Sequence, residues 1–245
     1  SLAIYAGGMQ SKIENNVVEQ AILKALQKTN NQEVKTFLID RLVFCGSHES
    51  VTSLSKYLKD DALFKPALSA LTAIGNTKAS EAIMEAAQSA KNNEQLALIH
   101  ALGTLKYQPA VNFIAGLASS NSKDVQQYAL SALSEIASAS SKDILINAVK
   151  SANYKLDASK AIIALINYGQ RLSEDGNLSL SSEIGNLILK NCKTEDQLHF
   201  RSAAIHLLSD IEGASFTKTL LKEAKNKNEK YSASVINAAS QNLLS

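Results

Sequence analysis

The feature of this sequence that most constrains its fold is a set of three residues that recurs along the chain. A leucine is followed three positions later by an apolar residue or cysteine in six places, and twelve positions later by another apolar residue in five of them, Leu165 being the exception. The leucines are spaced 29, 31, 31, 32 and 43 residues apart. We call them the anchor leucines: Leu42, Leu71, Leu102, Leu133, Leu165 and Leu208. A period of this length predicts an array of repeated units.

Each unit is predicted to contain two helices. Around Leu71, apolar residues recur with helical spacing as far as Ile74, a polar break follows, and Ala82 and Ile83 resume the pattern. No useful length of chain alternates with period two, so the prediction is an all-α fold. It has about six complete helix pairs and partial units at both ends. Within one domain, residues 1–245, the units are 1–29, 30–60, 61–91, 92–121, 122–151, 152–193, 194–227 and 228–245.

Residues with capping chemistry accompany the predicted helix starts. Asn30 with Glu33, and Thr194 with Gln197, have the spacing of a capping box. Pro109 suits the first turn of a second helix, because proline lacks an N–H group that would be free there anyway. His48 lies in a predicted turn between helices, where we expect it to have a capping role.

A small residue just before the anchor leucine completes the pattern, at Ala70, Ala101, Ala132 and Ala164. Together with the anchor pair and the short break, it resembles HEAT repeats, particularly the short variety first associated with phycobilisome lyase subunits. Pro66, inside a predicted first helix, matches a proline that often kinks the first helix of such repeats. The resemblance covers nearly the whole chain. It implies a right-handed α–α superhelix whose units bury each other's apolar faces.

The resemblance also implies that the second helices line a concave side. Placing the units in register predicts polar positions there, at Thr52, Lys56, Glu81, Glu85, Asn112, Gly116, Asp143 and Asn147. This stripe is mixed in charge and lacks aromatic residues, and the net charge of the chain is only +2. Binding to nucleic acid needs cationic side chains and stacking platforms, so we do not expect it. No apolar run is long enough to span a bilayer.

The unit 152–193 is long, with an apparent insertion at residues 169–181 between its two helices. One interpretation makes Tyr168, Arg171, Glu174 and Asp175 part of a binding ridge, because insertions in repeat arrays cluster on one face. The other is an extended first helix followed by a solvated loop. A similar Tyr–Gly segment begins at Tyr5, which we interpret as the cut edge of a further repeat.

No catalytic, cofactor-binding or metal-binding site is predicted. His100 and His206 lie two positions before their anchor leucines, where other units have Asp, Ser or Ile, so we expect a variable helix surface. Nucleophile-elbow, phosphate-loop and Cys-x-x-Cys motifs are absent. Cys45 is expected to be a buried apolar residue, and its distance of four units from Cys192 predicts that the two do not form a disulfide.

These observations favour a non-catalytic scaffold or protein-interaction module within a longer polypeptide. Its partner would be another protein or an adjacent domain. The alternative is a subunit or accessory domain of an enzyme, as the lyase resemblance suggests, and the third option is nucleic-acid binding. Similar bacterial arrays precede concanavalin-like β-sandwich domains that act on sugars. That resemblance implies an exported parent protein whose chemistry lies outside these 245 residues.

Overall fold

The computed structural model describes residues 12–244, and every regular element in that range is a helix. The contacts divide the chain into two compact blocks, which we call the N-terminal block (residues 1–110) and the C-terminal block (residues 111–245). Each is described by itself. The predicted cut edge at Tyr5 lies outside the described residues. The all-α prediction is confirmed.

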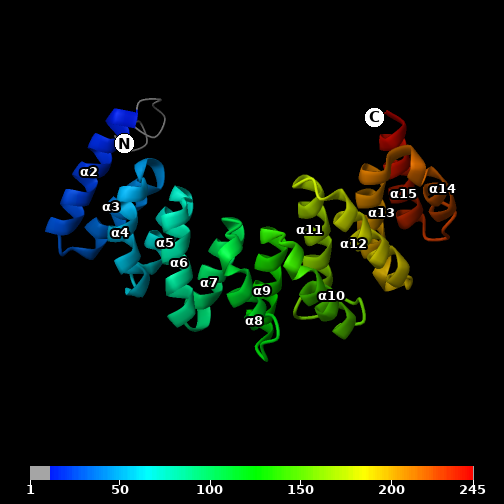
Figure 1. Ribbon diagram of the computed structural model, residues 1–245, viewed down its shortest axis with the longest axis horizontal. Coiled ribbons are helices and arrows are strands. Elements are labelled where there is room, and N and C mark those ends of the chain that lie inside the picture. Colours follow the sequence, from blue (N-terminus) through cyan, green and yellow to red (C-terminus); the bar gives the residue numbers. More distant parts are fainter. Residues whose placement is uncertain (1–11, 245) are drawn as a thin grey trace. The chain divides into compact units, whose positions relative to one another are not determined.

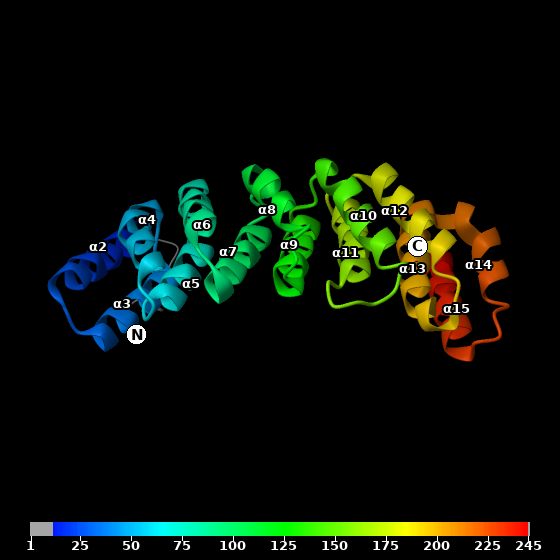
Figure 2. The ribbon, with the colours of Figure 1, turned by 90° about the horizontal axis from the view of Figure 1, so that it is seen from below.

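The N-terminal block contains a succession of short helices joined by tight turns (Figure 1). Its α-helices are α2 (Lys12–Lys28), α3 (Gln32–Cys45), α4 (His48–Ser55), α5 (Phe64–Ile74), α6 (Thr77–Ser89) and α7 (Asn92–Thr104). Two 3-10 turns, η1 (Lys56–Lys59) and η2 (Gln108–Ala110), follow α4 and α7. In Figure 2, α4 and α6 lie in one layer, and α3, α5 and α7 lie in the other. The block is therefore a two-layered row of helix pairs.

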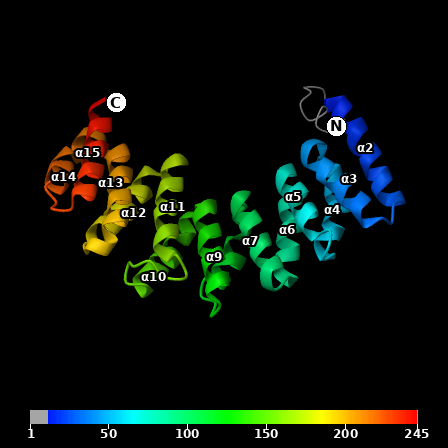
Figure 3. The same ribbon diagram turned by 180° about the vertical axis from the view of Figure 1, so that it is seen from behind.

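The C-terminal block has the same organisation. Its α-helices are α8 (Val111–Leu117), α9 (Lys123–Ile136), α10 (Lys142–Ser151), α11 (Ala161–Glu174), α12 (Leu178–Asn191), α13 (Leu198–Glu212), α14 (Thr217–Glu223) and α15 (Glu229–Leu244). Its 3-10 turns are η3 (Ala139–Ser141), η4 (Glu195–Gln197) and η5 (Gly213–Phe216). The first helices α11, α13 and α15 lie side by side (Figure 3).

The anchor leucines form the centre of the packing in both blocks. All six, from Leu42 to Leu208, are 0% exposed. The apolar residues twelve positions later are also buried: Leu54, Ile83, Ile114, Leu145 and Leu220. Burying each such side chain contributes about 1.5–3 kcal/mol. The recurring pattern in the sequence is therefore the pattern of the core, and the helical-repeat prediction is confirmed.

The predicted helix caps are only partly correct. Asn31, and not Asn30, caps α3, with its Oδ1 accepting the Val34 N–H at 3.1 Å. The backbone turns one residue later than predicted because Thr29 Oγ1 accepts the Asn31 N–H. The predicted capping box at Thr194 and Gln197 is confirmed: Gln197 Oε1 accepts the Thr194 N–H at 3.3 Å and its hydroxyl at 2.8 Å.

Two further expectations about helix starts change in detail. Pro66 is the third residue of α5, so it lies in the first turn of the helix rather than inside it. An N–H group there would have no acceptor within the helix, which is why proline is tolerated. His48 is the first residue of α4, and Ser47 is the cap, since its Oγ accepts the Glu49 N–H at 3.3 Å.

In the structure residues 169–174 extend the first helix α11, as one of the two sequence-based interpretations expected, and no loop spans the whole of residues 169–181. Only residues 175–177 lie between α11 and α12, and the other residues extend these two helices. Tyr168 is 0% exposed, and its hydroxyl donates to the Ser138 carbonyl oxygen at 2.9 Å. Burial raises the pKa of Tyr168 to about 12. A Cβ atom on Gly169 would lie 2.9 Å from Leu207, so the glycine allows close packing of the extended helix.

A partly buried ion pair stabilises the last helices of the chain, with the side chains of Arg201 and Glu223 15% and 10% exposed. Arg201 of α13 donates to both carboxylate oxygens of Glu223 of α14, from Nε and from Nη2, each at 2.8 Å. The Tyr231 hydroxyl of α15 donates to the same carboxylate at 2.6 Å, and Arg201 also donates to the Cys192 carbonyl oxygen at 3.1 Å. The hydrogen bonds from Arg201 hold the pKa of Glu223 below its ordinary value of 4.5.

We expect this ion pair to make stability depend on pH. Because the pKa of Glu223 is lower in the folded chain than in the unfolded one, its stabilisation is complete above pH 4.5 and is lost as the pH falls further. Arg201→Leu leaves the partly buried carboxylate with the Tyr231 hydroxyl as donor but without its cation, so urea unfolding at neutral pH should show a loss of about 1–3 kcal/mol. Glu223→Gln should lose less stability on acidification than the wild type does. An equal loss in both proteins would contradict this role.

A pair of glycines tests how closely α12 and α13 pack. A Cβ atom on Gly185 would lie 2.8 Å from Leu208 Cγ, whereas one on Gly116 of α8 would meet nothing within 4 Å. Gly185→Ala should therefore destabilise the chain by about 1–3 kcal/mol through overpacking. Gly116→Ala is the matched control and should be neutral or stabilising by up to about 1 kcal/mol. Urea unfolding of both variants gives the comparison, and equal effects would contradict the close packing.

Candidate interaction groove

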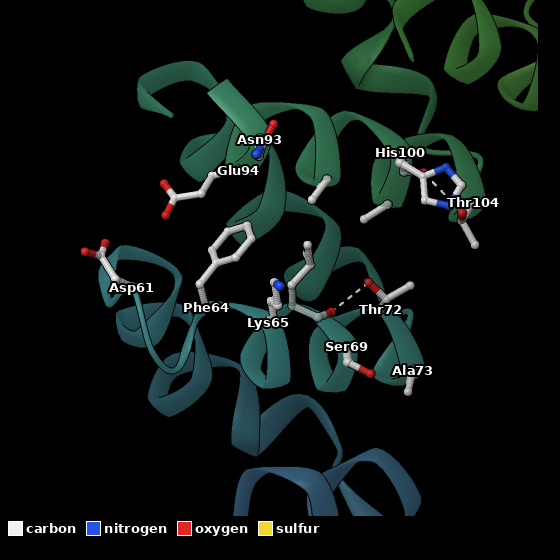
Figure 4. Close-up of a pocket in the computed structure, with 13 residues that line it drawn as sticks. Asp61, Phe64, Lys65, Ser69, Thr72, Ala73, Asn93, Glu94, His100 and Thr104 are labelled. Atoms are coloured by element: carbon white, nitrogen blue, oxygen red, sulfur yellow. Dashed lines mark hydrogen bonds between the residues drawn. The ribbon is translucent and has the colours of Figure 1, made fainter. Parts of the chain in front are cut away.

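The N-terminal block has a groove between α5 and α7, with a volume of about 650 Å³ (Figure 4). Leu68, Thr72 and Ala73 line it from α5, and Ala97 and Ala101 line it from α7. It exists because α7 packs closely on α6 and makes far fewer contacts with α5. The two first helices therefore leave a strip of apolar side chains between them that no other described helix covers.

Three hydroxyl side chains line the groove, those of Ser69, Thr72 and Thr104, and two of them bond within their own helices. The Thr72 hydroxyl donates to the Leu68 carbonyl oxygen at 2.7 Å, and the Thr104 hydroxyl donates to the His100 carbonyl oxygen at 3.1 Å. The small side chains of Ala97 and Ala101 leave the space empty. An apolar surface of a partner can therefore cover Thr72 and Thr104 without leaving their hydroxyl groups unpaired.

Charged side chains flank one end of the groove. Figure 4 shows Asp61 and Glu94 beside Phe64 at this end, and His100 and Thr104 at the other. Lys65 lies between them on α5. Within residues 12–244, the carboxylates of Asp61 and Glu94 form no ion pair. They are thus available to a cationic group on a ligand.

Sequence reasoning missed this groove. It treated the position of His100 as a variable helix surface, and His100 in fact lines the groove. The signal in the sequence was the pair of alanines, Ala97 and Ala101, one turn apart on the side of α7 that faces α5. In the C-terminal block the junction between α13 and α15 is bridged instead, because Ser234 Oγ lies 2.5 Å from Ser202 Oγ and 2.9 Å from His206 Nε2.

The predicted concave residues are all exposed, and the structure brings some of them together in two hollows. Lys56 and Glu85 line a hollow of about 360 Å³ in the N-terminal block. Asp143 and Asn147 line one of about 480 Å³ between α10 and α12, beside an ion pair between Lys142 and Glu183 at 3.1 Å. The remaining predicted positions lie exposed on α4, α6 and α8: Thr52, Glu81, Asn112 and Gly116. A binding role for these residues stays a prediction.

The predicted ridge loses its aromatic member, because Tyr168 belongs to the core. Arg171 links α11 to α9, with its Nε and Nη2 each 2.9 Å from Glu135 Oε2, and its Nη1 lies 2.6 Å from Glu174 Oε2. Asp175 is exposed just after α11. Arg171 thus has a clear structural role in joining two helices, and a partner-binding role of the ridge stays a prediction.

The cysteines are buried and free, as predicted. Burial raises the pKa of the Cys192 thiol to about 11, and burial, followed by the charge of Glu19, raises the pKa of Cys45. Among residues 12–244, no group of three or more His, Cys, Asp or Glu side chains is placed to hold a metal ion. In the same range, no helix is long and apolar enough to cross a membrane.

Comparison with known proteins supports a HEAT repeat array. The sequence model of HEAT repeats matches residues 80–166, from α6 to α11. HEAT repeats commonly mediate protein interactions, and such a match suggests a helical-repeat scaffold or interaction module. No curated protein matches the chain. Among solved structures, the crystal structure of an engineered protein is similar at 17% identity over 93% of this chain and 96% of that chain. Its TM-score is 0.33, which is too low to support an argument.

Because the chain contains no tryptophan, one introduced at Ala97 would report on the groove alone. We expect Ala97→Trp to emit at shorter wavelength and to be quenched less by acrylamide than Gln88→Trp, a control at an exposed site on α6. Since Ala97 faces open space, unfolding should show a change in stability of no more than about 1 kcal/mol. Equal quenching of the two variants would mean that the groove is closed in solution.

Proposed function

We propose that this chain is a non-catalytic helical-repeat module that binds a protein partner in the groove between α5 and α7. The match to HEAT repeats supports an interaction module. The observation that carries the proposal is the apolar strip between two helices, with the hydroxyls of Thr72 and Thr104 bonded away within their own helices. The strip is recessed, since Leu68 and Ala101 are only 9% and 4% exposed, and it could receive apolar side chains of a partner between the polar groups that flank it.

The other functions suggested by the sequence stay hypotheses. They are a lyase-like enzyme subunit, a repeat region attached to a sugar-acting β-sandwich domain in an exported bacterial protein, and nucleic-acid binding. No cluster of side chains within residues 12–244 favours any of the three over partner binding. The predicted second-helix residues, such as Asp143 and Asn147, offer a second surface for a partner or an adjacent domain.

The proposal is tested by selecting ligands for the folded chain. A phage-displayed library of 16-residue peptides is panned on the wild type, and the enriched peptides are synthesised and measured by fluorescence anisotropy. We expect Ala97→Trp, which fills the groove, to weaken their binding at least about tenfold, equivalent to about 1.4 kcal/mol. Gln88→Trp should bind as the wild type does. Peptides that bind Ala97→Trp as tightly as the wild type would overturn the proposal.

A further inference from the structure

We infer that the partner segment held between α5 and α7 is a basic amphipathic α-helix. This inference rests on the proposed function and adds the chemistry of the partner. The apolar face of the partner helix would pack on Leu68, Ala97 and Ala101, and its lysine or arginine side chains would lie beside Asp61 and Glu94.

The first argument concerns the backbone. The groove lies between two α-helices whose interior N–H and C=O groups are bonded within each helix. One common way in which an extended peptide binds is to add backbone hydrogen bonds to a sheet edge, and neither α5 nor α7 offers one. A helix satisfies its own backbone and binds through side chains alone. The walls of the groove therefore favour a helical ligand over an extended one.

The second argument concerns shape. From Glu94 to Thr104 the wall formed by α7 is about 15 Å long, which is the length of a helix of about three turns. Small residues line it at Ala97 and Ala101 on α7, and at Ala73 on α5. Small side chains let a helix approach closely, as the first helices of this chain approach one another elsewhere. The ligand would present apolar residues at positions i, i+4 and i+7.

The third argument concerns charge. Asp61 and Glu94 carry two negative charges at one end of the groove, and Lys65 carries one positive charge further along α5, so these three lining residues have a net negative charge. The nearby Asp60 carboxylate is hydrogen-bonded to its own turn, since its Oδ1 accepts the N–H groups of Ala62 and Leu63. The net charge of the whole chain is +2, so attraction for a basic ligand must come from the groove itself and not from the overall field.

Two designed peptides of 16 residues test the inference. Both have the same leucine and alanine face, and their polar face carries lysine in one and glutamate in the other. By fluorescence anisotropy at moderate salt, we expect the basic peptide to bind at least about fivefold more tightly than the acidic one, since exposed ion pairs act weakly. D61K/E94K should remove this preference. The matched control D124K/D210K changes the net charge equally on exposed positions of α9 and α13, outside every predicted binding surface, and should keep the preference.

The outcomes separate the inference from the proposed function. If both peptides bind equally and Ala97→Trp weakens both, the groove binds helices but the inference about charge is wrong. If D124K/D210K removes the preference as well as D61K/E94K does, overall charge is responsible and the inference is again wrong. If neither peptide binds, while the apolar dye ANS binds the wild type and not Ala97→Trp, the groove is a small-molecule pocket. That result would overturn both proposals.

Discussion

Each anchor leucine must be buried between its own helix pair and the neighbouring pair. The rest of this structure depends on this constraint. A helix pair cannot bury its own apolar faces, so each anchor leucine becomes fully buried only when the neighbouring pair packs against it. The small residues before the anchors, such as Ala70 and Ala132, let the helices approach closely enough for this. With no sheet within residues 12–244, helix-on-helix packing is the only source of a core there. Any site must then arise from the way in which successive helices meet.

The junctions between successive first helices are not equivalent, and their differences locate the groove. Between α9 and α11, the ion pair of Arg171 with Glu135 joins the helices. Between α13 and α15, Ser234 joins Ser202 and His206 by hydrogen bonds. Between α5 and α7, small side chains face one another across open space. At the same repeat position, side chains can thus either join two successive first helices or leave a groove between them. Two or three side chains decide which.

This explains what could be predicted from the sequence. The anchor leucines follow from a period that recurs six times, so the helical-repeat fold and the core could be recognised. The unit of Tyr168 breaks the period, and a break by itself allows both a binding ridge and an extended first helix, so the sequence left the place of Tyr168 open. Asn30 and Asn31 offer equal capping chemistry, and the turn held by Thr29 decides between them. The groove depends on which side chains of α5 and α7 face each other, and the period of the repeat does not predict these contacts.

An open junction of this kind also limits how tightly it can bind. Three leucine-sized side chains packed on the strip would contribute about 5–9 kcal/mol. Association itself costs about 4–15 kcal/mol, so the apolar contact alone gives weak binding at best. The charges of Asp61 and Glu94 then decide which helices bind, because a small difference in electrostatic free energy is a large share of a small total free energy of binding.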